Sequence, residues 1–318
     1  MNIIETKLNE NEKCPKNPNL DKSRRSYPEK LMNQGLRRMK IDKEQFLTVL
    51  IAVFGCVVTF SLNHGAIKIN GEIYYLPLKL GAVAASALIG LIGGFLFRVH
   101  AAVNHSASFA GMSAMIAIAT TEQSIMVGVV VGIVYIFLKK MFGGVGGKLG
   151  TIGMISTLIV ATILLPFNSY SHCDFAAWTA VTPTLVIASI VTGALGSVVT
   201  LAVREQIVLK TFKSNDAVIG SAAVGLIGSL LLPYIPAVGS ALSLVLYEGS
   251  FAGMSSRKRL SGYPAFLTAG ALAGAFFAAI FGLFPGCGGK LGFMAFSSVL
   301  IYQYGLSRLT PLRNASST

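Results

Sequence analysis

The hexapeptide SFAGMS occurs twice in this chain, at Ser108–Ser113 and at Ser250–Ser255. The pentapeptide GGKLG also occurs twice, at Gly146–Gly150 and at Gly288–Gly292, and both motifs recur with the same offset along the chain. Eleven identical positions at one constant offset indicate an internal duplication. A weaker match of the tetrapeptide GLIG, with a slightly shorter offset, lies at 90–93 and 225–228.

The composition around these motifs is typical of a membrane protein. Of the 318 residues, 53% are hydrophobic and 12% are charged, about half the charged fraction of a soluble domain. Residues 1–45 alone hold 11 of the 26 basic and 7 of the 13 acidic side chains. The remaining body has too few charges to cover a globular surface, but it can face lipid.

We therefore predict an all-α polytopic membrane protein. A hydrocarbon core of about 30 Å requires about 20 apolar residues in a helix. Ten segments approach this length, and they lie at 46–63, 78–97, 101–119, 124–138, 149–167, 176–203, 216–233, 237–254, 263–283 and 290–306. The third and the eighth are rich in Ser, Gly and Ala, so either could instead be re-entrant.

The two ends of the chain are predicted as tails. Residues 1–45 mix Asn, Lys, Glu and Pro with little apolar periodicity, which is typical of a mostly disordered basic tail. A short amphipathic helix at 29–43 could lie along the membrane surface. Residues 307–318 are predicted as a short C-terminal tail.

The basic residues favour ten crossings over eight. With a cytoplasmic N-terminal tail and ten crossings, the rest of the chain places 12 Lys and Arg side chains inside and 3 outside. With eight crossings the same side chains divide into 6 inside and 9 outside, against the positive-inside rule. We expect a multi-pass protein of the bacterial inner (plasma) membrane, with both termini cytoplasmic.

The duplication and the crossings together predict the topology. Repeats at 46–167 and 176–306 would hold five helices each, and an odd number of crossings makes the second repeat enter from the opposite side. The loop charges agree, because no basic residue occurs in Thr120–Gln123 after the first SFAGMS, whereas Arg257–Arg259 follows the second. This pattern predicts an inverted-topology repeat, a common plan of secondary transporters.

The two repeated motifs each allow two interpretations. SFAGMS puts small residues in mid-helix, where they permit close helix packing or line a solute path beside a cavity. The glycine–lysine turns fail the pattern of a phosphate-binding loop, because Phe142 and Phe284 stand where glycine is needed. Lys148 and Lys290 then either snorkel to the interface or attract anions at the mouths of a pathway.

Glu248 is the strongest candidate for a functional residue. It is the one acidic side chain deep in a predicted span, where charge costs at least about 2.5–3.5 kcal/mol and is usually functional. The alternative is a protonated carboxyl that only bonds a neighbouring helix. We expect the two SFAGMS helices to face each other, so that Glu248 and His105 approach. The predicted pathway residues are Asn104, His105, Ser106, Ser108, Gly111, Ser113, Glu248, Ser250, Gly253 and Ser255, with Lys148 and Lys290 at the mouths.

Other functional classes lack support in the sequence. The four histidines are scattered and the four cysteines show no CxxC spacing, so no catalytic residue, metal or cofactor is predicted. The basic residues lie in a tail and in short loops, which argues against nucleic-acid binding. We expect a transporter of a small solute or ion in the lipid bilayer, working by alternating access. A passive channel is one alternative, a membrane-embedded enzyme or non-transporting subunit is another, and a homo-oligomer is left open.

Overall fold

The structure is a computed structural model that describes residues 42–165, 170–212 and 216–315. The predicted N-terminal tail lies outside the described residues up to position 41, and so does most of the surface helix predicted at 29–43. The chain divides into two units, 1–46 and 47–318, and the candidate site belongs to the second.

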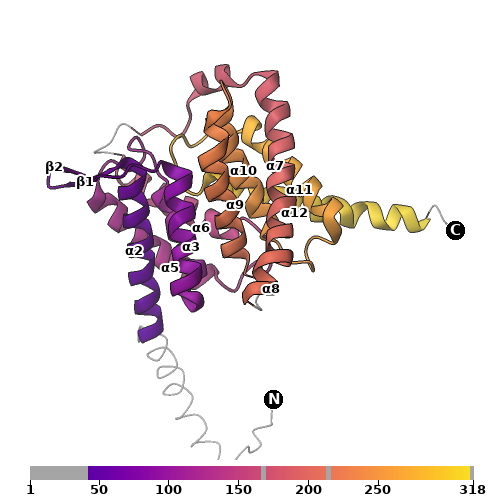
Figure 1. Ribbon diagram of the computed structural model, residues 1–318, viewed down its shortest axis with the longest axis horizontal. Helices are drawn as coiled ribbons and strands as arrows, with labels where there is room; N and C mark the ends of the chain where they lie inside the picture. Colours follow the sequence, from indigo (N-terminus) through magenta and orange to yellow (C-terminus); the bar gives the residue numbers. More distant parts are fainter. Residues whose placement is uncertain (1–41, 166–169, 213–215, 316–318) are drawn as a thin grey trace, which may run out of the picture. The chain divides into compact units, whose positions relative to one another are not determined.

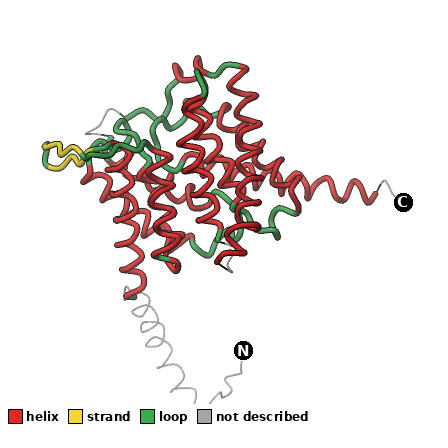
Figure 2. The backbone as a smooth tube through the Cα atoms, viewed as in Figure 1, coloured by secondary structure: helices red, strands yellow, loops and turns green. Residues whose placement is uncertain are grey.

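The described chain is mostly helical (Figure 1), and Figure 2 shows its strands gathered in one hairpin. The α-helices are α2 (Lys43–His64), α3 (Ala82–Leu96), α4 (Ala101–Gly111), α5 (Thr121–Leu138), α6 (Lys148–Ile163), α7 (Pro183–Val203), α8 (Leu209–Phe212), α9 (Ala217–Leu231), α10 (Gly239–Gly253), α11 (Gly262–Ala279) and α12 (Lys290–Ala315). Short helical turns lie at η1 (Arg98–His100), η2 (Phe175–Ala180), η3 (Arg204–Val208, a π-helix) and η4 (Leu232–Tyr234).

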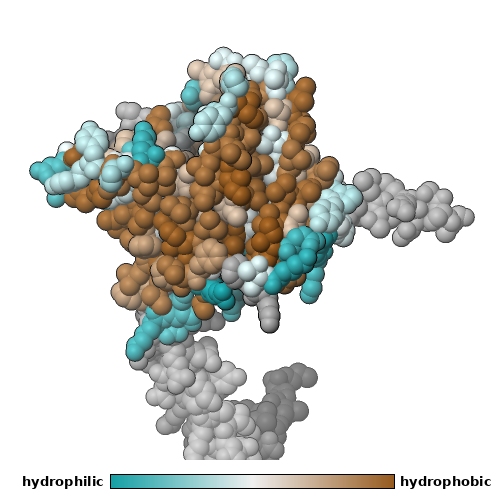
Figure 3. Space-filling model, viewed as in Figure 1, coloured by the Kyte–Doolittle hydropathy of each residue, from teal (hydrophilic) through white to brown (hydrophobic). Residues whose placement is uncertain are grey.

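Five helical segments of the described chain are long and apolar enough to cross a membrane, as in an integral membrane protein. They are Lys43–His64, Thr121–Leu138, Pro183–Thr211, Ala217–Tyr234 and Gly262–Ala279. The helices α3 and α6 are apolar but shorter. Figure 3 shows apolar residues over most of the visible face and hydrophilic residues toward its margins. Side chains of this kind are stable against lipid rather than water.

Polar side chains fix where some of these helices begin. The hydroxyl of Thr120 accepts a hydrogen bond from the Gln123 N–H before α5, and the hydroxyl of Thr182 accepts one from the Leu185 N–H before α7. Each bond satisfies one of the N–H groups that a helix start leaves without an intrahelical acceptor. Pro183 at the start of α7 suits this position, because it has no N–H to satisfy.

The described chain is consistent with the predicted all-α class, and a short β-hairpin is a local exception. Strands β1 (Ala66–Ile69) and β2 (Glu72–Tyr75) pair in antiparallel register after α2. Asn70 and Gly71 form the connection with φ angles of 51° and 83°, the left-handed conformation that a two-residue hairpin loop requires. The Asn-Gly pair is the sequence signal for this hairpin.

One predicted helix is shorter than expected. The third predicted crossing, 101–119, is helical only over the 11 residues of α4. At 1.5 Å per residue this helix is about 17 Å long, well short of a hydrocarbon core of about 30 Å. Helix α12 continues to Ala315 and so extends into the C-terminal tail predicted from residue 307.

The segments that connect the helices form two groups, one at each end of the helices. Hydrogen bonds within each group show which segments belong to it. At one end, the His64 Nε2 atom at the close of α2 lies 2.9 Å from the carbonyl oxygen of Ser113, just after α4. The Ser113 hydroxyl also accepts a hydrogen bond from the turn before α12. Phe284 in the same connection donates its N–H to the carbonyl of His172, on the way into α7. We call this end, where α12 begins, the Lys290 end.

The opposite end is where α6 begins, and we call it the Lys148 end. Arg204, just after α7, donates from Nη1 to the carbonyl oxygens of Gly253 and Ser255 at 2.6 and 3.0 Å. Ser255 in turn accepts a hydrogen bond from the N–H of Gly146, just before α6. Thus α2 ends and α7 begins at the Lys290 end, and these two helices run in opposite directions.

Candidate functional site

The SFAGMS motifs close their helices instead of lying in mid-helix as predicted. Helix α4 ends at Gly111 and α10 ends at Gly253. A Cβ atom on Gly111 would lie 2.5 Å from the Cys56 carbonyl oxygen of α2, and one on Gly253 would lie 2.6 Å from the Ser197 carbonyl oxygen of α7. Both glycines therefore permit close approach of another helix backbone, which favours the packing interpretation.

Each copy of SFAGMS is bonded to the glycine–lysine turn of the other half. The hydroxyl of Ser113 accepts a hydrogen bond from the Gly288 N–H at 3.1 Å. The equivalent hydroxyl, that of Ser255, accepts one from the Gly146 N–H at 3.0 Å. We call these two bonds the crossed contacts. The two acceptors are related by the same sequence offset as the motifs, and so are the two donors.

A second pair of bonds supports the crossed contacts. The Ala114 N–H donates to the Gly286 carbonyl at 2.8 Å, and the Ser256 N–H donates to the Gly144 carbonyl at 2.8 Å. The two donors and the two acceptors are again related by the offset of the motifs. The two halves of the chain therefore repeat both sequence and contacts, one set at the Lys290 end and the other at the Lys148 end.

The glycine–lysine turns have the same backbone conformation. Phe142 and Phe284 both have a φ of 48°, a left-handed conformation that is rare for a bulky residue. The helices α6 and α12 begin at the lysine of each turn, as the sequence predicted. They meet at Gly150 and Gly292, where a Cβ atom on Gly150 would lie 2.6 Å from the Cα atom of Gly292.

The two lysines bind carbonyl groups at the ends of the preceding helices. Lys148 donates from Nζ to the carbonyl oxygens of Lys139 and Met141 at 2.9 and 3.2 Å. Lys290 donates to the carbonyl oxygen of Phe281 at 2.7 Å. These carbonyl groups belong to residues just after α5 and α11, so each lysine stabilises the turn that follows a helix. This structural role is shared by both lysines, but only the surroundings of Lys290 include Glu248.

Buried hydroxyl groups lie beside the motif helices in both halves. The Ser86 hydroxyl of α3 lies 3.0 Å from the Ser108 hydroxyl and 3.2 Å from the Tyr247 hydroxyl. In the second half, the Ser221 hydroxyl of α9 lies 2.7 Å from the Ser250 hydroxyl. Ser86, Ser221 and Tyr247 were not among the predicted site residues. The offset of the GLIG match relates Ser86 to Ser221 and could have identified this pair.

Three predicted residues of α4 are buried but point to different partners. Asn104 donates from Nδ2 to the Ile89 carbonyl at 2.8 Å, and Ser106 donates to the Leu149 carbonyl at 2.7 Å. The His105 ring packs 4.2 Å from that of Phe109, and its Nε2 atom has no hydrogen-bond partner among the described residues. The structure therefore does not gather these side chains around one open centre.

Aromatic rings fill the space between the two motif helices. The phenylalanines of the two SFAGMS copies, Phe109 and Phe251, are buried with their ring centroids 4.5 Å apart. Tyr247 packs 4.4 Å from Phe251 and 5.8 Å from Phe109. The two motif helices thus meet through side chains, and the space between them is closed in this conformation.

Glu248 is fully buried on α10, and neither carboxylate oxygen has a hydrogen-bond partner among the described residues. It forms no hydrogen bond with His105, whose ring instead faces Tyr247 at 6.5 Å between centroids. Leu244, one turn before Glu248 on the same face of α10, lines a pocket that Lys290 also lines. A buried carboxylate without donors is costly, so it must take up a proton or be balanced by a cation.

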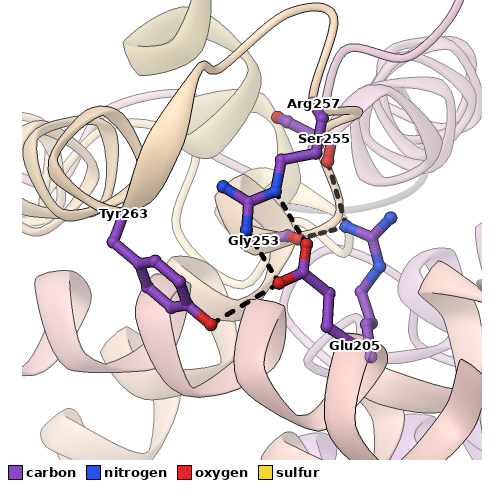
Figure 4. A network of polar contacts seen from close by, with 6 residues as sticks. Glu205, Gly253, Ser255, Arg257 and Tyr263 are labelled. Atoms are coloured by element: carbon purple, nitrogen blue, oxygen red, sulfur yellow. Dashed lines mark hydrogen bonds and ion pairs between the residues drawn. The ribbon is translucent and has the colours of Figure 1, made fainter. Parts of the chain in front are cut away.

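A polar network lies at the Lys148 end (Figure 4). Arg257 forms two hydrogen bonds with the Glu205 carboxylate, both of 2.7 Å, and the Tyr263 hydroxyl lies 3.5 Å from the same carboxylate. The Glu205 hydrogen bond raises the pKa of the Arg257 guanidinium above its ordinary value. This network joins the end of α7 to the connection between α10 and α11.

Comparisons of the chain with protein-family models, with curated proteins and with solved structures find no match.

Proposed function

We propose that this protein is a multi-pass membrane transporter of a small solute or ion, working by alternating access between two five-helix inverted repeats. The observation that carries the proposal is Glu248, a fully buried carboxylate without a hydrogen-bond donor among the described residues. Its helix also carries the repeated motif. An ionisable group in such surroundings is expensive and is typically kept for function.

The crossed contacts support the inverted-repeat architecture. They occur at opposite ends, at Ser113 with Gly288 and at Ser255 with Gly146. The opposite directions of α2 and α7 agree with it. In this proposal α4 and α10 are the short third and eighth crossings. The positive-inside rule then makes the Lys148 end and both termini cytoplasmic, in a bacterial inner membrane.

The same contacts supply a mechanism for alternating access. Both crossed contacts are formed, and Phe109 and Phe251 close the space between the motif helices. This conformation corresponds to an occluded state. Breaking the contact at one end while keeping the other would expose the centre to one side at a time. The contacts at the two ends are equivalent, so the state open at the Lys290 end and the state open at the Lys148 end should have similar energies. Rocking of one repeat against the other requires two such states.

In this proposal Glu248 couples the uptake of the solute to a proton or cation gradient. A carboxyl in apolar surroundings can take up a proton facing one side and release it facing the other, or hold a cation while it is ionised. Glu248→Gln keeps the shape of the side chain and removes the ionisation. We expect this variant to express and fold but to lose gradient-driven uptake, whereas Glu248→Asp retains part of it.

The test is uptake by purified protein in proteoliposomes. A panel of radiolabelled amino acids, carboxylates and alkali cations is offered under an imposed proton or sodium gradient. Glu72→Gln, on the exposed hairpin, is the matched control and should transport at the wild-type rate. Uptake by Glu248→Gln at the wild-type rate would exclude coupling through Glu248 and make a passive channel the better interpretation. Absence of flux by the wild-type protein would favour a non-transporting subunit or an enzyme.

A further inference from the structure

A pocket of about 190 Å³ lies at the Lys290 end, between α10, α11 and the start of α12. Its lining includes Leu244, Phe277, Cys287, Lys290 and Leu291, and it reaches the exposed Gly286. The volume is ample for several water molecules. The pocket is therefore a route by which water can approach the interior from this end.

Glu248 lies one helical turn beyond Leu244, a lining residue of this pocket. Leu244 precedes it by four residues on α10, so both side chains lie on the same face of the helix. The repeat supports the same placement, because Ser106, the counterpart of Glu248, bonds the carbonyl of Leu149. The counterpart of Leu149 is Leu291, which lines the pocket.

We propose that this pocket carries protons from the Lys290 end to Glu248, and that Lys290 controls when the carboxylate is protonated. This inference rests on the proposed coupling role of Glu248. Water in the pocket gives a proton to the carboxylate, forming a neutral O–H group, and the same bond breaks when the proton is released. The Lys290 ammonium favours the ionised carboxylate, so it sets the proton concentration needed for loading.

The surroundings favour a proton over a metal cation. Calcium and magnesium need several oxygen ligands, and no lining residue of this pocket has a side-chain oxygen. A metal cation would also lie beside the positive charge of Lys290. A proton needs no further ligand, because the O–H group it forms is neutral.

Few other groups can titrate near Glu248. Among the described residues of the elements packed on α10, Lys290 and Cys287 are the ionisable groups that line the pocket, and Tyr247 is the neighbour in the chain. His105 of α4 is a further buried ionisable group, and its ring lies 6.5 Å from that of Tyr247. The middle turns of α3, α7, α9 and α11 have no ionisable side chain. The remaining groups on these elements are Arg204, Glu205, Asp216 and Tyr263 at the Lys148 end, the exposed Tyr234 in η4, and Tyr302, Tyr304, Arg308 and Arg313 far along α12.

The two halves differ at this position, which supplies a matched control. Lys148 is the counterpart of Lys290 and also binds carbonyl groups, but Ser106 stands where the second half has Glu248. Replacing Lys148 therefore removes an equivalent charge and an equivalent helix-end contact without touching the proposed proton route.

The first test measures protonation of Glu248 without any substrate. Dicyclohexylcarbodiimide modifies protonated carboxyl groups in apolar surroundings, and peptide mass spectrometry locates the adduct. We expect Glu248 of the full chain in liposomes to be modified more at lower pH. In Lys290→Gln, modification should persist to a higher pH than in the wild-type protein, because the charge favouring ionisation is gone. Lys148→Gln should follow the wild-type profile.

The second test concerns the route. In a variant whose cysteines other than Cys287 are replaced by serine, a bulky thiol reagent on Cys287 should slow modification of Glu248 at least several-fold. The control is the corresponding variant that keeps only Cys173, which lies at the same end but does not line the pocket. Modification there should leave Glu248 as reactive as before.

The outcomes separate this inference from the proposed function. Identical pH profiles for Lys290→Gln and the wild-type protein would overturn the control by Lys290. No effect of the Cys287 adduct, or no reaction of Glu248 at any pH, would overturn the route. Neither result depends on transport, whereas wild-type uptake by Glu248→Gln would overturn the coupling function even if the carboxyl titrates as expected.

Discussion

The hydroxyl oxygen of Ser113 accepts a hydrogen bond from the backbone N–H of Gly288, across 175 residues of chain and at 3.1 Å. Both groups are buried, so the N–H of this turn is satisfied by a side chain from the other half of the molecule. The equivalent bond joins Ser255 to Gly146 at the opposite end. Each half therefore completes the hydrogen bonding of the other, and this interdependence has measurable consequences.

Removing either hydroxyl should destabilise the protein. Ser113→Ala leaves the buried Gly288 N–H without its acceptor, and Ser255→Ala does the same to Gly146, at a cost of about 1–3 kcal/mol each. Thermal unfolding in detergent measures the loss, and the exposed Ser240→Ala is the control. Because the two contacts lie at opposite ends, the effects should add in the double variant. An unchanged melting temperature in both single variants would show that these bonds contribute nothing.

The contact between α6 and α12 should not tolerate a methyl group. Gly150→Ala would place a Cβ atom 2.6 Å from the Cα atom of Gly292, which is backbone and can only move with its helix. Overpacking of this kind typically costs about 1–3 kcal/mol. Gly143→Ala is the matched control, since a Cβ atom there would meet no described atom within 4 Å. Equal melting temperatures for the two variants would contradict the close approach.

The proposed orientation predicts a labelling pattern. Cys173 lies near the Lys290 end and should react with a membrane-impermeant maleimide on intact cells. A single cysteine at the exposed position Lys258, near the Lys148 end, should react only after the membrane is permeabilised. Permeabilised cells provide the control for reactivity of both sites. Labelling of position 258 from outside would contradict the inverted arrangement.

The Arg257–Glu205 pair should contribute little and should depend on salt. The two side chains are 41% and 22% exposed, so a double-mutant cycle with Gln at both positions should give a coupling energy of about 1 kcal/mol or less. Added salt should reduce it by screening. The pKa of Arg257 is raised, so the guanidinium stays charged at neutral pH and in acid. The coupling should therefore be lost only in acid, as the carboxylate is protonated. Persistence in acid would show that the coupling is not ionic.

The sequence determined the class of structure and the sites of its repeated elements. Runs of apolar residues predicted the membrane-spanning helices, because such runs are stable only in lipid or in a protein interior. The GGKLG copies predicted turns that open helices at Lys148 and Lys290, and both helices begin there. The Asn70-Gly71 pair is likewise a local sequence signal, in this case for the hairpin of β1 and β2. Each of these signals depends only on residues that are close together in the sequence, so each can be recognised without knowing the tertiary structure.

The tertiary structure decided which residues meet. The sequence placed SFAGMS in mid-helix and expected Glu248 near His105, whereas both helices end within the motif and the His105 ring faces Tyr247. The partners of Ser113 and Ser255 lie in the other half of the chain, so no local pattern could reveal them. Burial of Glu248 without a hydrogen-bond donor likewise depends on how the helices pack around α10. Sequence sets the order of groups along a helix, but their neighbours are set by which backbones can approach one another.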